Sequence, residues 1–277
     1  MNDLASTIEN NVAAALAEDI GSGDWTAQLI AVDSHATASV ISRDDAIVCG
    51  ALWFDACFRK LDPMARIDWL VSEGSRAGVG QRLCNVSGSA RVLLTAERTA
   101  LNFLQLLSAV ATATRRYVDI VAGTQAKIVD TRKTLPGLRI AEKYAVRIGG
   151  GINHRIGLYD AILIKENHIA AAGSLPAAII NAKDIAPAGV WIQVEVVNLA
   201  QLEPAITAGA KMILLDNMTL EQMREAVHIA AGRAELEASG GITLANVRAV
   251  AETGVDRISI GSLTKDIKAV DLSMRFE

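Results

Sequence analysis

The segment KIVDTRKTLPG, at residues 127–137, combines residue types that could bind an anion. It begins with an apolar run typical of a buried strand and then places Thr131, Arg132 and Lys133 side by side before a Pro-Gly pair. Adjacent cations repel each other unless an anion neutralises them. A guanidinium group is suited to planar carboxylate or phosphate partners. We therefore expect Arg132 and Lys133 to hold an anionic ligand.

Polar or glycine-containing groups also end the other apolar segments of the second half of the chain. The strand candidates are AKIVDT, DAILIK, WIQVEVV, KMILLD, AELEAS and RISIGS. Their ends are, in chain order, Thr131-Arg132-Lys133, Lys165, Glu195, Asp216, Ser239-Gly240-Gly241 and Gly261-Ser262. Any one of these could be a solvated rim residue. Six successive strand ends of this kind indicate a site, because barrel chemistry gathers at the carboxyl ends of the strands.

The fold follows from the spacing of these ends. Glu195, Asp216, Ser239 and Gly261 are 21, 23 and 22 residues apart, and helical stretches separate them. This alternation predicts βα units, a parallel sheet, and a barrel or near-barrel. No G-x-G-x-x-G follows a first strand, which disfavours a doubly wound nucleotide fold. The first 110 residues mix short strands and helices, and a long helix over about 89–121, with a break expected near Ser108, joins the halves.

Composition excludes several classes of protein. The net charge of -4 disfavours a general nucleic-acid binder, and no apolar run reaches the roughly 20 residues of a membrane helix. The N-terminus lacks the pattern of a signal peptide, so we expect a cytoplasmic protein. Cys49, Cys57 and Cys84 form an odd set without C-x-x-C spacing and are interpreted as buried, reduced thiols. The histidines show no zinc-ligand spacing.

Charge is unevenly distributed around the predicted barrel. Residues 127–168 contain eight basic and four acidic side chains. Three of the basic residues, at helical spacing, are interpreted as surface charge: Arg139, Lys143 and Arg147. Four of the remaining five lie at strand ends or in the loop GGGINHR and form a predicted cationic wall: Arg132, Lys133, Arg155 and Lys165. The implied ligand is small and carries more than one carboxylate.

Glu195 and Asp216 end neighbouring strands opposite this wall. Such a pair could bind a divalent cation, hold sugar hydroxyls or stabilise a developing positive charge, or each acid could pair with a nearby cation such as Lys211. The glycine-rich ends SGGIT and IGSLT could bind a phosphate through backbone N–H groups. Their hydroxyl residues could instead cap helices.

Together these segments resemble the quinolinate phosphoribosyltransferase family. The signature is DTRKTLPGLRIAEKYAVRIGGGINHRIGLYDAILIKENHI, supported by EDIGSGDWT, VEVVN, LLDNM, EASGGI and the ending IGSLTKDIKAVDLSMRF. Glu166 and Asp266 depart from the expected pattern at positions without an assigned role. The resemblance implies a mixed α/β N-terminal sandwich domain over 1–110 and an incomplete α/β barrel with parallel strands over 111–266. A tail, 267–277, is implied to pack back on the first domain.

The resemblance also implies an activity, substrates and roles. Quinolinate and phosphoribosyl pyrophosphate, with Mg²⁺, would give nicotinate mononucleotide, pyrophosphate and CO2 in de novo NAD synthesis. Matching positions place Arg132, Lys133, His154, Arg155 and Lys165 around quinolinate, and Thr131 is a further candidate for substrate binding. Glu195 and Asp216 would face the ribose and the magnesium-bound pyrophosphate, and Ser239, Gly240, Gly241 and Gly261 the phosphate. Lys133, Lys165, Glu195 and Asp216 are the candidate catalytic residues. The family is at least a homodimer, in which Arg98 would reach the partner's site; its alternative role is a helix-surface pair.

Two other functions remain open. A Schiff-base aldolase would use Lys165 as its nucleophile. A repurposed relative of the family would act as a small-anion binding module. The complete set of NHR, K-NH and paired acids favours the enzyme.

Overall fold

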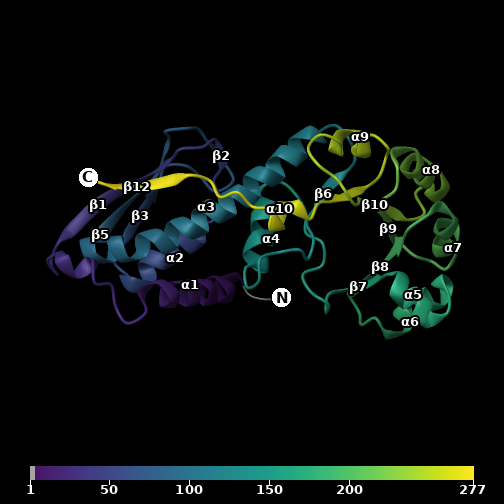
Figure 1. Cartoon of the computed structure of the whole chain (residues 1–277), viewed down its shortest axis with the longest axis horizontal. Helices are drawn as coiled ribbons and strands as arrows, with labels where there is room; N and C mark the ends of the chain where they lie inside the picture. The colour runs from purple at the N-terminus through teal and green to yellow at the C-terminus, as the bar shows by residue number, and fades with distance from the viewer. Residues whose placement is uncertain (1–3) are drawn as a thin grey trace. The chain divides into compact units, whose positions relative to one another are not determined.

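The computed structural model describes residues 4–277, which form two compact units (Figure 1). The first unit contains the chain up to Arg115 together with Thr134–Gly149 and Leu263–Glu277. The second unit contains Arg116–Lys133 and Gly150–Ser262. The units are therefore interleaved along the sequence. The segment 134–149 lies in the first unit, whereas the sequence-based boundaries placed it in the barrel.

The first unit is built on a four-stranded antiparallel sheet in the order β12-β1-β5-β3. The C-terminal strand belongs to it, because Ser42 to Ala38 of β1 pair with Leu272 to Phe276 of β12. The elements are α1 (Leu4–Ile20), a 3-10 turn (Ala27–Leu29), β1 (His35–Ser42), β2 (Ala46–Ile47), α2 (Ala51–Leu61), β3 (Arg66–Trp69), β4 (Arg76–Ala77), β5 (Arg82–Ser89), α4 (Arg139–Ile148), α10 (Ser262–Lys265, from the last residue of the second unit) and β12 (Leu272–Phe276).

Apolar side chains from α2, α3 (Ala90–Ile120) and the sheet form the core of this unit. Trp53, Phe54 and Phe58 are fully buried on α2. The helix α3 continues through Ser108 without the expected break. The Ser108 hydroxyl bonds instead to the Cys49 backbone, accepting from its N–H at 3.0 Å. All three cysteines are free and buried, as expected.

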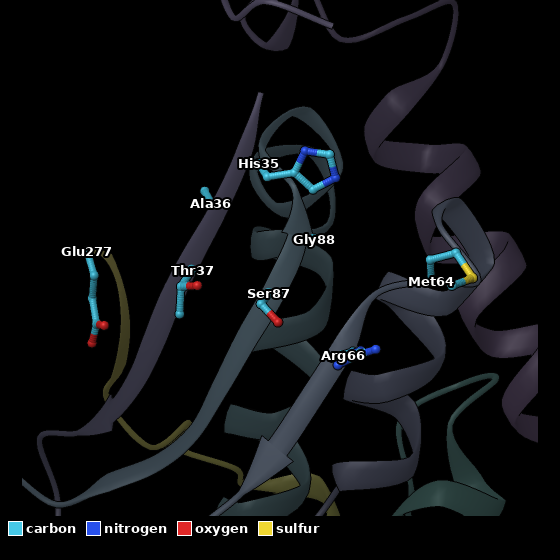
Figure 2. Close-up of a pocket in the computed structure, with 8 residues that line it drawn as sticks. All are labelled: His35, Ala36, Thr37, Met64, Arg66, Ser87, Gly88 and Glu277. Carbon is cyan, nitrogen blue, oxygen red and sulfur yellow. The ribbon is translucent and has the colours of Figure 1, made fainter. Parts of the chain in front are cut away.

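The other face of the sheet carries polar side chains around a cavity of about 670 Å³ (Figure 2). His35 and Thr37 of β1, Ser87 of β5 and Arg66 of β3 contribute to it. One apolar and one polar face is the usual pattern of an antiparallel sheet covered on one side. This cavity contains none of the site residues predicted from the sequence.

The second unit is built on a sheet of six parallel strands in the order β6-β11-β10-β9-β8-β7. The six predicted strands are all present: β6 (Lys127–Val129), β7 (Ala161–Ile164), β8 (Trp191–Val196), β9 (Met212–Asp216), β10 (Glu235–Ser239) and β11 (Arg257–Ser259). The edge strands β6 and β7 do not pair with each other, so the barrel is incomplete, as expected. Ile152 bridges Val129 at the β6 edge and thereby fixes the loop that carries Asn153, His154 and Arg155.

Helices follow the strands of this sheet and lie on its outer side (Figure 1). They are α5 (Glu166–Ala172), α6 (Leu175–Ile185), a 3-10 turn (Leu199–Gln201) leading into α7 (Leu202–Thr207), α8 (Leu220–Ala230) and α9 (Val247–Ala251). Side-chain oxygens of Ser174, Asn198 and Thr219 cap three of these segments. The sequence analysis did not expect α5, which begins directly after Lys165.

The interpretation of Lys143 as surface charge is wrong. Its side chain is 2% exposed, and the neighbouring Glu142 is 0% exposed. Arg147 is exposed, whereas Arg139 is half-buried and donates to Thr134 Oγ1 at 3.0 Å. Five of the ten residues of α4 are buried, including both Glu142 and Lys143. Because more than one side of the helix is covered, the i, i+4 basic stripe does not mark its solvent-facing side.

Glu142 should make the stability of the protein dependent on pH. Burial raises the pKa of Glu142 from 4.5 to about 7, although the Leu135 N–H and Arg139 oppose this shift. The folded state then holds a proton that the unfolded state has lost, so stability should fall as pH rises from 4.5 to about 7. Glu142→Gln should remove this fall, on the order of 2–3 kcal/mol. Thermal unfolding between pH 5 and 8 measures it.

Glu225→Gln provides a matched control, because Glu225 is exposed on α8. That variant should keep the pH dependence of the wild-type chain. An equally steep dependence in Glu142→Gln would exclude Glu142 as its source.

Candidate active site

A pocket of about 250 Å³ lies at the carboxyl ends of the strands of the second unit. It brings together most of the residues predicted from the sequence: Thr131, Arg132, Lys133, His154, Arg155, Lys165, Glu195, Asp216 and Ser239. Four residues without a predicted role also line it: Leu163, Leu214, Glu237 and Ser259. The parallel sheet explains this convergence, since six strand ends meet at one edge.

The remaining predicted residues lie outside this lining. Gly261 lies against it, because a Cβ atom there would be 2.9 Å from Lys133 Cδ and 3.7 Å from Thr131 Oγ1. Gly240 adjoins Asn217, the residue after Asp216. Arg98 is exposed on α3 in the first unit.

Repulsion between cations is built into one side of the pocket. Burial, and secondly the nearby Arg132 guanidinium, lower the pKa of Arg155, while Asp160 opposes the shift. The Arg155 side chain is held by Nη1, which donates to the Ala161 carbonyl at 3.1 Å. The Lys133 N–H donates to Thr131 Oγ1 at 3.0 Å, which tightens the turn that carries Arg132. An anion bound here would relieve the repulsion.

The acidic side of the pocket includes an ion pair. Lys165 Nζ lies 2.5 Å from Glu195 Oε2, and the two side chains are 48% and 14% exposed. Their strands are adjacent, with Ile164 in register with Val194. Glu195 thus has the cationic partner that the sequence analysis left open as an alternative. An ion pair this exposed contributes only about 0–1 kcal/mol, so a substrate could replace either half of it.

Asp216 has a different neighbour from the one considered. Its Oδ2 accepts a hydrogen bond from the Asn217 amide at 3.0 Å. Asn217 has φ 53°, a left-handed conformation that asparagine tolerates better than most residues. Its N–H donates to the Ser239 carbonyl at 2.9 Å, which ties the ends of β9 and β10 together.

A buried polar chain in the wall of the pocket was not predicted from the sequence. His154 Nε2 lies 2.8 Å from Gln193 Oε1, and Gln193 Nε2 donates to Glu237 Oε2 at 3.0 Å. Gln193 and Glu237 are 0% and 1% exposed. A usable signal existed: fully buried parallel strands read as continuous apolar runs, and β8 and β10 are interrupted by polar residues at alternate positions.

Gly240 is required by the packing at this edge. Its φ is +103°, and a Cβ atom would lie 2.1 Å from Asn217 Oδ1 and 3.2 Å from Asn217 Cα. Gly240→Ala should therefore destabilise the fold by about 1–3 kcal/mol and displace the Asn217 amide from Asp216. The loss is measured as the difference in the free energy of unfolding between the full-length variant and the wild-type chain in a denaturant titration.

Gly241→Ala is the matched comparison for this variant. Gly241 also has positive φ, +61°, but nothing lies within 4 Å of its Cβ position. It should lose less stability, about 1 kcal/mol. Equal losses in the two variants would show that the contact with Asn217 is not what requires glycine.

Comparison with known proteins gives a consistent result. A domain model described as "Quinolinate phosphoribosyl transferase, N-terminal domain" matches residues 24–108, and the corresponding C-terminal domain matches 110–275. The "Probable nicotinate-nucleotide pyrophosphorylase [carboxylating]" of Bacillus subtilis is 43% identical, over 93% of this chain and 89% of that protein. The Mycobacterium leprae protein of that name, without "Probable", is 42% identical over 96% and 95%.

A solved structure is also similar over the whole length. It is described as the nicotinate-nucleotide pyrophosphorylase from Francisella tularensis, with a TM-score of 0.96 and 45% sequence identity. The similarity covers 100% of this chain and 98% of that one. Both domain models match, and relatives above 40% identity are aligned almost end to end. The chain belongs to the quinolinate phosphoribosyltransferase family of enzymes.

Proposed function

We propose that this chain transfers the phosphoribosyl group of phosphoribosyl pyrophosphate to quinolinate and releases CO2, pyrophosphate and nicotinate mononucleotide. This reaction belongs to de novo NAD synthesis. The observation that carries the proposal is the pocket of the second unit. Strand ends bring Arg132 and Lys165, and the loop after Ile152 brings Arg155, to one cavity with Glu195 and Asp216. Family membership supports the same assignment.

Quinolinate is a small dianion, and the cationic side of the pocket is suited to it. Arg132 and Arg155 provide planar donors for carboxylates, and Lys133 and Lys165 add two further positive charges. Thr131 and His154 complete the lining. A dianion lowers the mutual repulsion of Arg132 and Arg155, so binding it stabilises this side of the site.

Glu195 and Asp216 act on the ribose. The pyridine nitrogen forms a bond to the anomeric carbon as the bond to pyrophosphate breaks, and positive charge develops on the ribose. Carboxylates fixed beside that charge lower the barrier electrostatically. Asn217 keeps Asp216 oriented by donating to its Oδ2. Backbone N–H groups at Ser239, Gly240, Gly241 and Gly261 hold the ribose phosphate.

Loss of CO2 uses the charge formed in the first step. The bond between ring carbon 2 and its carboxylate breaks, and the electron pair remains on the ring, stabilised by the adjacent positive nitrogen. That carbon then takes a proton. Lys165 pairs with Glu195 and provides charge near the substrate without acting as a nucleophile. This pairing engages the Lys165 side chain and so disfavours the Schiff-base aldolase, whose lysine nitrogen must attack a carbonyl carbon.

The acids of the pocket fit Mg²⁺ as a partner of the substrate. Among the described residues, no group of three or more His, Cys, Asp or Glu side chains could hold a metal. Mg²⁺ commonly takes one or two carboxylates and completes its shell with water and phosphate oxygens. Asp216 and Glu195 are the candidate ligands. When bound, the ion supplies positive charge to the leaving pyrophosphate.

We also propose a cytoplasmic homodimer in which Arg98 enters the partner's site. The proposal of a cytoplasmic location rests on the three cysteines, which are free and buried, because cytosolic thiols are kept reduced. In the part of the chain that the structure describes, no helix has the length and apolarity needed to span a membrane. The positions three and four residues from Arg98 in α3 are Leu94, Thr95, Leu101 and Asn102. None is acidic, which disfavours an i, i+3 or i, i+4 ion pair for Arg98; its electrostatic neighbour on the helix is the adjacent Glu97, whose pKa is raised by burial and lowered to a smaller extent by Arg98.

The assay for the reaction measures CO2 released from quinolinate labelled at its 2-carboxylate. Release should require phosphoribosyl pyrophosphate and Mg²⁺, and nicotinate should give no product. Arg132→Ala should weaken quinolinate binding by about tenfold or more, because a charge-assisted contact contributes about 1.5–3 kcal/mol. Arg224→Ala, on the exposed side of α8, should leave binding unchanged. Quinolinate binding without CO2 release would identify a binding module.

Mixing two inactive variants tests the role of Arg98. If Arg98 acts in the partner's site, Arg98→Ala and Lys165→Ala subunits together form heterodimers with one intact site. A random equal mixture should recover about a quarter of wild-type activity. Activity that stays at the level of the separate variants would place Arg98 in its own subunit's site or outside the site.

A further inference from the structure

The hydrogen bonds around His154 fix the position of its ring proton from two independent ends. The backbone N–H of Arg155 points at Nδ1, with a distance of 2.8 Å. Nδ1 must therefore accept, since a proton there would face another donor. On the other side of the ring, Nε2 lies 2.8 Å from Gln193 Oε1. A neutral ring has one donor and one acceptor, so Nε2 carries the hydrogen and donates to Gln193.

Glu237 fixes which end of the Gln193 amide faces the histidine. Gln193 Nε2 lies 3.0 Å from Glu237 Oε2. A flipped amide would place its oxygen against the carboxylate, and the two acceptors would repel. The carboxylate thus orients the amide, and the amide oxygen then selects the Nε2–H form of His154. Gln193 and Glu237 are both inaccessible to solvent, so water cannot substitute for these bonds.

The chain also connects two central strands to the anion-binding loop. Glu237 lies on β10 and Gln193 on β8, with β9 between them in the sheet. The His154 N–H donates to Asp130 Oδ1 at 2.8 Å, and the ring packs edge-on against Trp191 with centroids 5.0 Å apart. Through Nδ1, the ring holds the backbone of Arg155, a residue that lines the pocket.

We propose that Gln193, oriented by Glu237, is a positioning residue that holds His154 as its neutral Nε2–H tautomer and thereby sets the orientation of Arg155. Its functional consequence rests on the proposed reaction. The tautomer itself does not, and can be measured without activity. Glu237 Oε1 is buried and has no hydrogen-bond partner among the described residues, which is energetically unfavourable. The role of this carboxylate in orienting Gln193 helps to explain why it is present.

The first test is nuclear magnetic resonance of the ring nitrogens in the full-length chain. The chain has four histidines, so assignment by substitution of the other three is practical. His154 in the wild-type chain should show a protonated Nε2 and an unprotonated Nδ1 at neutral pH. A protonated Nδ1, alone or together with Nε2, would overturn the proposal.

The second test changes the chain at one position. Gln193→Met keeps similar volume but removes both bonds, and leaves Glu237, with Oε2 3.8 Å from His154 Nε2, free to pair with the ring directly. The resonance of the His154 Nε2–H should shift, because its proton loses the Gln193 acceptor, and the KM for quinolinate should rise by about tenfold with little change for phosphoribosyl pyrophosphate. An unchanged spectrum would overturn the proposal. Gln81→Met, exposed in the first unit, is the control.

A reciprocal exchange separates positioning from packing. In Gln193→Glu with Glu237→Gln, residue 193 still accepts from Nε2, and residue 237 donates to residue 193. This double variant conserves charge and volume and should restore the Nε2–H signature and most of the quinolinate affinity. Failure to restore either one would show that the bond pattern is not what selects the tautomer. If Gln193→Met does not fold, Glu237→Gln alone is measured instead. It removes the carboxylate that orients the Gln193 amide, and its spectrum and KM for quinolinate are interpreted in the same way.

Discussion

Charge repulsion at one edge of a parallel sheet is the constraint on which the site depends. Arg155 is half-buried beside Arg132, and the turn at Thr131 to Lys133 adds another cation close to them. Such an arrangement is unfavourable in an empty pocket, so rigid elements must hold it in place. The β6 edge, the Ile152 bridge and the Arg155 bond to Ala161 provide that rigidity. In the proposed reaction, the dianionic substrate would relieve this repulsion.

The three acids of the site differ in their partners and in their burial, although each ends or interrupts an apolar strand. Glu195 is paired with Lys165, and Asp216 is oriented by Asn217. Glu237 is buried in the pocket wall, where the Gln193 amide is its partner. The first two remain accessible and can change partners during a reaction. The third cannot be reached by solvent and is suited to holding other groups in place.

The parallel sheet and the convergence of its strand ends could be predicted from the sequence, because a regular βα period leaves few arrangements open. The six strands and the grouping of Arg132, Lys165, Glu195 and Asp216 follow from that period. Side-chain burial was harder to predict: Lys143 occupies a helical stripe that looks solvent-facing, but tertiary contacts bury it. The alternating polar residues of β8 and β10 mark Gln193 and Glu237 as unusual, but their pairing with each other joins different strands and follows only from the three-dimensional structure. The path of residues 134–149 into the first unit also has no local signal.

That path has a consequence for dissecting the molecule. The two domain models meet between residues 108 and 110, which would place a single domain boundary there. The compact units do not follow this junction, since the first unit takes α4 and the C-terminal strand from beyond it. A chain divided at residue 109 would give an N-terminal fragment whose β1 has an open edge where β12 belongs. The C-terminal fragment would carry α4 without the unit that buries it. The two halves therefore cannot be exchanged independently. Recombination at the apparent boundary would separate segments that fold together in the first unit.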